Sequence, residues 1–107
     1  MSITDELRTL AAPRREDIRL ESVLAALSDP VRLSIVRTLA AMPGSQRACG
    51  TFGLPVAKST ASHHFRVLRE AGVIDQRDHG RERLTELRQA DLDARFPGLL
   101  DSIVRAS

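Results

Sequence analysis

Apolar residues recur at the spacing of a helix face in two neighbouring stretches of the first half of the chain. The stretch 21–27 is short and consists of residues that favour helices. The stretch 30–41 is longer and has a clear start, because Asp29 suits an N-cap and Pro30 suits the first helical position, where no amide donor is needed. The residues 43–45 (Pro-Gly-Ser) break the pattern. These features predict two helices, of which the second is buried.

A third stretch, 58–71, has the clearest helical pattern in the chain. Ala61, Phe65 and Leu68 fall at i, i+4 and i+7, so they share one face. The opposite face carries small polar and basic side chains, and Gly72 stands where a C-cap belongs. The pattern predicts an amphipathic helix with one apolar side and one polar side.

Two segments in the first half have weaker patterns. We expect the first dozen residues to form a helix that has Leu7 and Leu10 on one face and ends at Pro13. The segment 46–52 has room for one or two helical turns, and a tight turn follows it.

The second half of the chain changes from helical to strand-like spacing and back. The segments 73–76 and 82–87 flank the polar residues 78–80, which predicts a hairpin with a polar tip. The segments 91–96 and 97–106 then complete the chain as helices.

This order of elements predicts a mostly α-helical fold with a small β-hairpin. A short helix, a tight turn and a helix with a small polar outer face form a helix-turn-helix, and a hairpin that follows at once makes it a winged helix-turn-helix. We expect an N-terminal extension over 1–20 and the winged helix-turn-helix domain over 21–107.

Composition narrows the class of protein further. A chain of 107 residues that is 42% hydrophobic and 28% charged is expected to be one globular domain. No apolar run approaches the roughly 18 residues of a membrane helix, and residues 1–10 lack the apolar core of a secretory signal. The single cysteine, Cys49, has no partner for an internal disulfide, which suits a reducing compartment. We therefore expect a cytoplasmic protein that does not contact a membrane.

Charge by itself says little about a nucleic-acid partner. The formal net charge is only +2, and residues 58–88 form the most basic part of the chain. Of the 16 lysines and arginines, only Lys58 is a lysine. Arginine suits bidentate recognition of phosphate and guanine, but a GC-rich genome produces the same bias, and we favour that second explanation.

Two segments resemble the ArsR/SmtB family of bacterial winged-helix repressors. The segment 27–33 (Leu-Ser-Asp-Pro-Val-Arg-Leu), followed by Ile35, resembles the family's helix-entry segment. Residues 58–74 resemble its recognition helix and the exit into its wing, and the likeness extends over about 21–104. The resemblance implies a homodimeric DNA-binding repressor that releases its operator when it senses a signal.

The polar face of 58–71 has the chemistry that DNA recognition needs. A helix that enters the major groove needs short polar side chains near its start, so that its backbone approaches base edges and phosphates closely. The family motif indicates base contacts from the early polar residues and phosphate contacts from the basic ones, and a basic wing tip suits the neighbouring minor groove. The expected DNA-contacting residues are Lys58, Ser59, Thr60, Ser62, His63, His64, Arg66, Arg69, Arg77 and Arg81.

The ligands of the family's metal sensors are missing. Those members carry paired cysteines in the short helix before the turn, or acid and histidine ligands on the C-terminal helix, whereas residues 47–52 hold one cysteine and residues 90–107 hold no histidine. We therefore expect no metal and no cofactor. For Cys49 two interpretations stay open: a redox-active thiol or a small buried hydrophobe.

The resemblance also implies how copies of the chain associate. In the family the first and last helices form the dimer interface, and a two-fold dimer implies an inverted-repeat operator. The expected dimer residues are Leu24, Leu27, Leu99, Leu100, Ile103 and Val104.

The inducing signal stays open, with a small molecule or a redox effector both possible from the sequence. The alternative function is a winged-helix module for protein–protein contact. We expect no enzyme, because the chain has no Gly-rich phosphate loop and no nucleophile–base arrangement.

Overall fold

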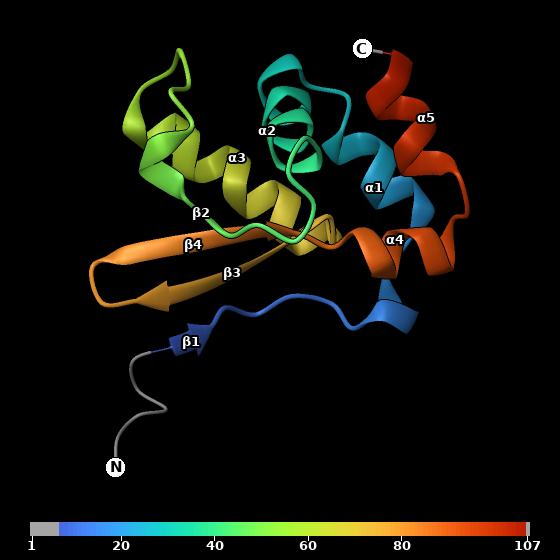
Figure 1. Ribbon diagram of the computed structural model, residues 1–107, viewed down its shortest axis with the longest axis horizontal. Coiled ribbons are helices and arrows are strands. Elements are labelled where there is room, and N and C mark those ends of the chain that lie inside the picture. Colours follow the sequence, from blue (N-terminus) through green and yellow to red (C-terminus); the bar gives the residue numbers. More distant parts are fainter. Residues whose placement is uncertain (1–6, 107) are drawn as a thin grey trace.

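The computed structural model describes residues 7–106, in which α-helices lie on one side of a long hairpin (Figure 1). The α-helices are α1 (Leu20–Ala26), α2 (Pro30–Ala40), α3 (Lys58–Ala71), α4 (Gln89–Arg95) and α5 (Leu99–Ala106). Two short 3₁₀ helices are η2 (Arg15–Asp17) and η3 (Cys49–Thr51). The strands are β1 (Leu7–Thr9), β2 (Arg47–Ala48), β3 (Ile74–His79) and β4 (Glu82–Leu87). The predicted order of helices followed by a wing hairpin is confirmed.

The predicted helix boundaries at Asp29 and Gly72 are also confirmed. The Asp29 Oδ2 atom accepts hydrogen bonds from the amides of Val31 (2.9 Å) and Arg32 (3.1 Å), which satisfies two donors in the first turn of α2. Gly72 adopts a left-handed conformation with φ +87°, and its amide bonds to the Arg69 carbonyl at 3.0 Å. Local sequence signals therefore determine where α2 begins and where α3 ends.

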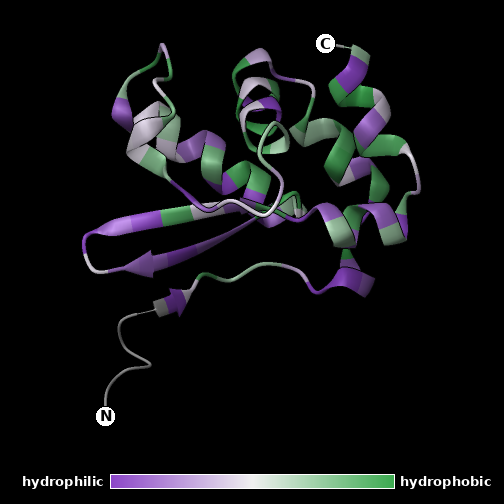
Figure 2. Ribbon diagram, viewed as in Figure 1, coloured by the Kyte–Doolittle hydropathy of each residue, from purple (hydrophilic) through white to green (hydrophobic). Residues whose placement is uncertain are grey.

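The hydrophobic core lies between the helices and the inner face of the hairpin. Its aliphatic composition follows from a sequence with three phenylalanines and no Tyr or Trp. Figure 2 shows that the apolar residues concentrate in the helices, while the hairpin is mainly hydrophilic. The buried hydrophobic residues are Ile18, Val23, Ala26, Leu27, Ile35, Val36, Leu39, Phe65, Leu68, Ala71, Val73, Ile74, Leu92 and Leu100.

The sheet is antiparallel with the strand order β1-β3-β4-β2. β1 pairs with the outer edge of β3, where Leu7 lies opposite His79 and Thr9 lies opposite Arg77. The helix expected over the first dozen residues is therefore wrong from residue 7 onward, and residues 1–6 lie outside the described part of the chain. The physical reason is that β3 offers backbone donors and acceptors along a free edge, and pairing with them outweighs a weak local helix pattern.

The segment 46–52 is only partly helical. Residues 49–51 form one 3₁₀ turn, as expected, but β2 before it is a strand in which Arg47 pairs with Thr85 of β4. β2 covers the second edge of the hairpin in this way, so the segment between α2 and η3 belongs to the same sheet as the wing.

Arginine side chains fasten the segment before α1 to the rest of the domain. Arg88 Nη1 donates to the Pro13 carbonyl (2.7 Å), and Arg95 donates to the carbonyls of Glu16 (2.8 Å) and Ile18 (2.7 Å). Ile18 itself is almost completely buried. The described part of the N-terminal extension thus packs as part of the domain.

Asp91 also holds the segment before α1 against the rest of the domain. Its carboxylate accepts hydrogen bonds from Arg15 Nε (2.6 Å) and Arg88 Nε (2.9 Å). Burial is the largest single influence and acts to raise the pKa of Asp91, but the hydrogen bonds and the positive charges of Arg15 and Arg88 together outweigh it, so the pKa lies below its usual value. The carboxylate is therefore ionised in the folded state and bridges η2 to the start of α4.

Alanine at position 72 is expected to destabilise the domain more than alanine at position 98. Both glycines have a left-handed φ, +87° and +83°, so both substitutions incur a backbone penalty of about 1–2 kcal/mol. At Gly72, however, a Cβ atom would lie 2.7 Å from Ile18 Cγ1, whereas at Gly98 it meets nothing within 4 Å. Urea unfolding should therefore show that Gly72→Ala loses at least about 1 kcal/mol more than Gly98→Ala. Equal losses would contradict this account of the contact between α3 and Ile18.

Candidate nucleic-acid interface

One face of α3 carries six exposed polar side chains within the first nine residues of the helix, and we call these six the polar row; the exposed Glu70 follows them near the end of the helix. They are exposed because the opposite face packs Phe65, Leu68 and Ala71 into the core. The polar row consists of Lys58, Ser59, Thr60, Ser62, His63 and Arg66. All six belong to the DNA-contacting residues expected from the sequence.

The N-terminus of α3 is left open, in contrast to that of α2. Ala57 occupies the N-cap position and provides no side-chain hydrogen bond, whereas Asp29 caps α2 with two. The first amides of α3 thus have no side-chain acceptor among residues 7–106. Together with the ammonium group of Lys58 and the positive end of the helix dipole, they favour an anion at this end of the helix.

The wing tip adds one more unpaired cation. Arg81 is exposed, directly after the turn at Gly80, and forms no ion pair with any residue that the structure describes. Its neighbour Arg83 is different, because it donates to both carboxylate oxygens of Asp78 (2.7 and 3.2 Å). The hydrogen bond from Arg83 lowers the pKa of Asp78, so this pair stays charged and neutralises itself.

His64 is removed from the expected DNA-contacting residues. Its side chain is only 8% exposed and faces α2 rather than solvent. Its Nδ1 atom lies 3.1 Å from Arg32 Nη1, and since arginine has only donors, this nitrogen accepts the hydrogen bond. Arg32 also donates to the Ala26 carbonyl (2.7 Å), so the pair joins α1, α2 and α3.

Arg69 and Arg77 are likewise used within the fold. Arg69 donates to Gln76 Oε1 (2.7 Å) and to the Ala11 carbonyl (3.2 Å). Arg77 forms an ion pair with Glu86 across the hairpin at 3.2 Å. Both guanidinium groups therefore take part in the fold, and the phosphate contacts expected from Arg69 and Arg77 stay a prediction. Arg66 is more exposed, and its Nη2 atom lies 3.3 Å from Nδ1 of the exposed His63.

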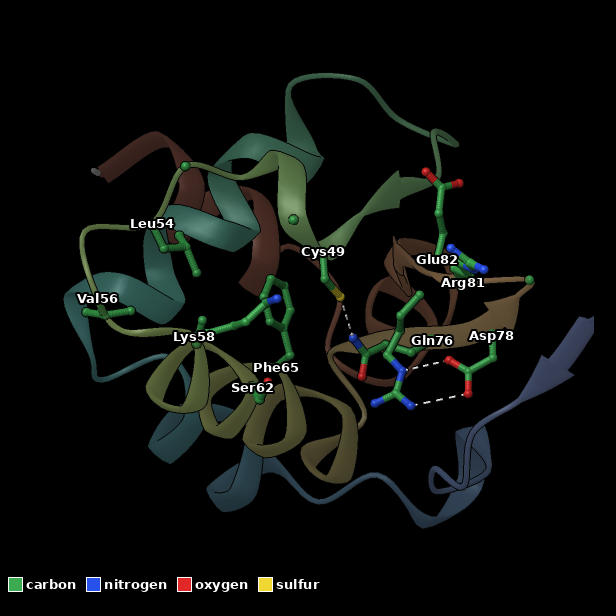
Figure 3. Close-up of a pocket in the computed structure, with 15 residues that line it drawn as sticks. Cys49, Leu54, Val56, Lys58, Ser62, Phe65, Gln76, Asp78, Arg81 and Glu82 are labelled. Carbon is green, nitrogen blue, oxygen red and sulfur yellow. Dashed lines mark hydrogen bonds and ion pairs between the residues drawn. The ribbon is translucent and has the colours of Figure 1, made fainter.

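A cleft of about 740 Å³ separates the first half of α3 from the wing. In Figure 3, Lys58, Ser62 and Phe65 reach toward it from α3, while Gln76 and Asp78 border it from β3. The residues that line it are Cys49, Gly50, Gly53, Leu54, Val56, Lys58, Ala61, Ser62, Phe65, Gln76, Asp78, Gly80, Arg81, Glu82 and Arg83.

A buried polar cluster forms the inner end of this cleft, and it was not predicted from the sequence. The Gln76 Nε2 atom lies 3.2 Å from Cys49 Sγ and 3.1 Å from Thr85 Oγ1, and Gln76 and Thr85 are both almost fully buried. One signal was present, because Gln76 alternates with the buried Ile74 and a polar residue at such a strand position needs partners. Cys49 is half-buried, and a redox role for its thiol stays a prediction.

Comparison with known proteins identifies the family. Residues 27–77 match a family model described as a helix-turn-helix domain. The uncharacterized HTH-type transcriptional regulator YceK of Bacillus subtilis (strain 168) is 39% identical over 83 residues, which span 76% of this chain and 82% of the relative. The chain belongs to the ArsR/SmtB-type winged helix-turn-helix transcriptional regulators. It is a DNA-binding transcriptional regulator.

Two solved structures share the fold of this ArsR-type regulator. The transcriptional repressor BigR from Xylella fastidiosa superposes with a TM-score of 0.63 at 25% identity, covering 88% of this chain and 96% of that chain. A possible transcriptional regulator for arsenical resistance superposes with a TM-score of 0.59 at 28% identity, covering 83% and 98% respectively.

The expected dimer residues of this ArsR-type regulator fall into three groups by their exposure. Leu27 and Leu100 are buried in the core of their own chain, which corrects their assignment to an interface. Leu24 is 45% exposed, as is its neighbour Leu20 at 43%, and the structure therefore offers an apolar face on α1. The expected residues on α5 are half-buried: Leu99, Ile103 and Val104.

Within residues 7–106 no group of three or more His, Cys, Asp or Glu side chains is arranged to hold a metal ion. None of the helices in the same range has the length and apolar content needed to cross a bilayer.

The two adjacent histidines of α3 should differ sharply when each is replaced. His64→Ala removes the buried acceptor of Arg32 and leaves a void, so we expect a loss of about 1–3 kcal/mol in the free energy of unfolding. His63→Ala changes an exposed side chain and should stay within about 0.5 kcal/mol of the parent protein. Chemical denaturation of the two variants measures this difference. If the His64→Ala protein were as stable as the His63→Ala protein, His64 would not have the structural role described above, and it would again be a candidate for DNA contact.

Proposed function

We propose that this regulator is a homodimeric repressor that reads an inverted-repeat operator with α3 and its wing. The observation that carries the proposal is the polar row of α3, exposed beside an open helix N-terminus and an unpaired wing-tip arginine. Small hydroxyls near the start of the helix suit base edges, and the surrounding cations suit phosphates. The proposed DNA contacts are Lys58, Ser59, Thr60, Ser62, His63, Arg66 and Arg81.

Side-chain length and charge indicate which of these residues contact bases and which contact phosphates. Ser59 and Ser62 are short enough to let the helix backbone approach the groove, so we assign them to base edges together with His63. Lys58 stands beside the uncapped amides of α3, and we assign this end of the helix to a phosphate. Arg81 extends from the wing tip and is assigned to the adjacent minor groove or backbone.

The exposed apolar face of α1 supports the homodimer. Leu20 and Leu24 are large hydrophobic residues that remain nearly half exposed, and α1 and α5 both lie at the end of the molecule away from the hairpin tip (Figure 1). A second copy that covers this face leaves both polar rows open. Two-fold symmetry then presents two α3 helices about one DNA turn apart, which favours an inverted repeat.

The repressor direction has support from a structural relative, since BigR is described as a transcriptional repressor. A regulator of this kind acts where the chromosome is, and we therefore propose that it works in the cytoplasm.

Substitutions in the polar row are expected to weaken operator binding without changing the fold. A duplex selected from a random pool for tight binding serves as the operator. Ser62→Ala should lower affinity about fivefold, which corresponds to one lost hydrogen bond of about 1 kcal/mol. Lys58→Gln should weaken binding to all sequences and reduce the slope of log Kd against log salt by about 1.

The matched control is Arg37→Gln, which removes an exposed cation from α2, outside the proposed surface. Fluorescence anisotropy at several salt concentrations compares the three variants with the parent protein. If Ser62→Ala and Lys58→Gln bind as the parent does, or if the control alone weakens binding, α3 does not read the groove. A chain that selects no duplex at all would instead favour a protein-contact module.

Leu24→Asp is expected to disrupt the dimer. Because the interface is two-fold symmetric, it would bury one added carboxylate from each subunit. Self-association should therefore weaken at least about tenfold. Met42→Asp is the matched control, because Met42 is also an exposed large hydrophobic residue but lies in the loop after α2. Sedimentation equilibrium measures the dimer dissociation constant of both variants and of the parent protein. Dimers of equal strength in the two variants would exclude α1 from the interface.

A further inference from the structure

The cleft between α3 and the wing has one apolar wall that DNA does not need. Leu54 and Val56 line it from the loop before α3, and Phe65 lines it from α3 itself. The two aliphatic side chains are only half-buried, so part of their apolar surface faces the open volume of about 740 Å³. A duplex presents charged phosphates at this surface, and these gain nothing from apolar side chains. A space of this size that combines an apolar wall with a few polar and charged groups is instead typical of a site for a small organic molecule.

The charged groups at the edge of the cleft select for a negative ligand. Lys58 and Arg81 have no ion-pair partner within residues 7–106, while Asp78 and Arg83 neutralise each other. Glu82 is the lining carboxylate left unpaired in that range. Two unpaired cations against one unpaired anion leave an excess of positive charge, and the open N-terminus of α3 adds to it.

We infer that this cleft binds a small amphipathic organic anion, and that the bound anion competes directly with DNA. The apolar part of the ligand lies against Leu54, Val56 and Phe65, and its anionic group lies between Lys58 and Arg81. The inference rests on the proposed function, because Lys58 and Arg81 are also proposed to hold operator phosphates. A ligand that takes both cations removes them from DNA, which gives a route to induction that needs no metal.

The position of Cys49 makes this inference testable. It is the single cysteine of the chain, and its side chain lines the cleft at the inner end (Figure 3). A ligand in the cleft must therefore slow the alkylation of Cys49 by a small neutral reagent such as iodoacetamide. Because a probe bound on the exposed face of α1 would leave this rate unchanged, the measurement locates the probe as well as detecting it.

The probe is 8-anilino-1-naphthalenesulfonate, which joins an apolar aromatic body to one sulfonate and fluoresces when bound. We expect saturable binding, slower alkylation of Cys49 measured by intact mass, and displacement of the probe by the selected operator. The double variant Lys58→Gln/Arg81→Gln should bind the probe at least about threefold more weakly, while Arg37→Gln should bind it as the parent does. Val56→Asp, which places a carboxylate in the apolar wall, should also weaken it.

Several outcomes would overturn the inference. These are the absence of saturable binding, an unchanged Cys49 alkylation rate at saturating probe, equal probe affinity in the double variant and in Arg37→Gln, or simultaneous binding of probe and operator. Circular dichroism of each variant shows whether it is folded, and the Arg81→Gln single variant serves if the double variant is not. Operator binding measured without probe tests the proposed function separately, so loss of that binding is distinguishable from failure of the cleft.

Discussion

The one-sided burial of α3 is the constraint on which the rest of the structure depends. Phe65, Leu68 and Ala71 enter the core, and an α-helix that buries one face must present the opposite face to solvent. That geometry exposes the polar row along its whole length. Because Gly72 turns the chain immediately after the helix, the wing begins where α3 ends and lies beside it. Recognition helix and wing therefore form one continuous surface as a consequence of packing.

Partly buried hydrogen bonds then fix α3 in place at two points. His64 and Arg32 tie its middle to α1 and α2, and Arg69 and Gln76 tie its end to β3. In each pair one side chain, His64 or Gln76, is buried, and leaving its polar atoms without a partner would be costly, so each pair favours a single arrangement of the elements it joins. Several arginines serve the same purpose elsewhere, as Arg88 and Arg95 do when they hold the carbonyls of the N-terminal segment. This internal use explains why the number of arginines is a poor measure of DNA-binding charge.

What the sequence predicted and what it missed follow from the range of the interactions involved. Asp29, Gly72 and the apolar spacing of 58–71 act within a few residues, so the helices and the polar row could be predicted from them. β1 depends on pairing with a strand about 70 residues away, and the spacing of residues within a short segment cannot predict such a pairing. His64 looked like one more polar residue on the recognition helix, because its partner Arg32 is distant in sequence. The cleft and its cluster around Gln76 arise only when η3, α3 and the hairpin come together.

The polar row and the wing tip together face DNA in the proposed complex, and nuclear magnetic resonance can locate the bound surface residue by residue. Backbone amide resonances of ¹⁵N-labelled protein would be compared before and after addition of a duplex selected for tight binding. We expect the largest shifts at residues 58–66 and 80–83, with small shifts over α1 and α5. Shifts centred on α1 and α5, with 58–66 unchanged, would contradict this. They would show that DNA binds to the surface that we propose as the dimer interface.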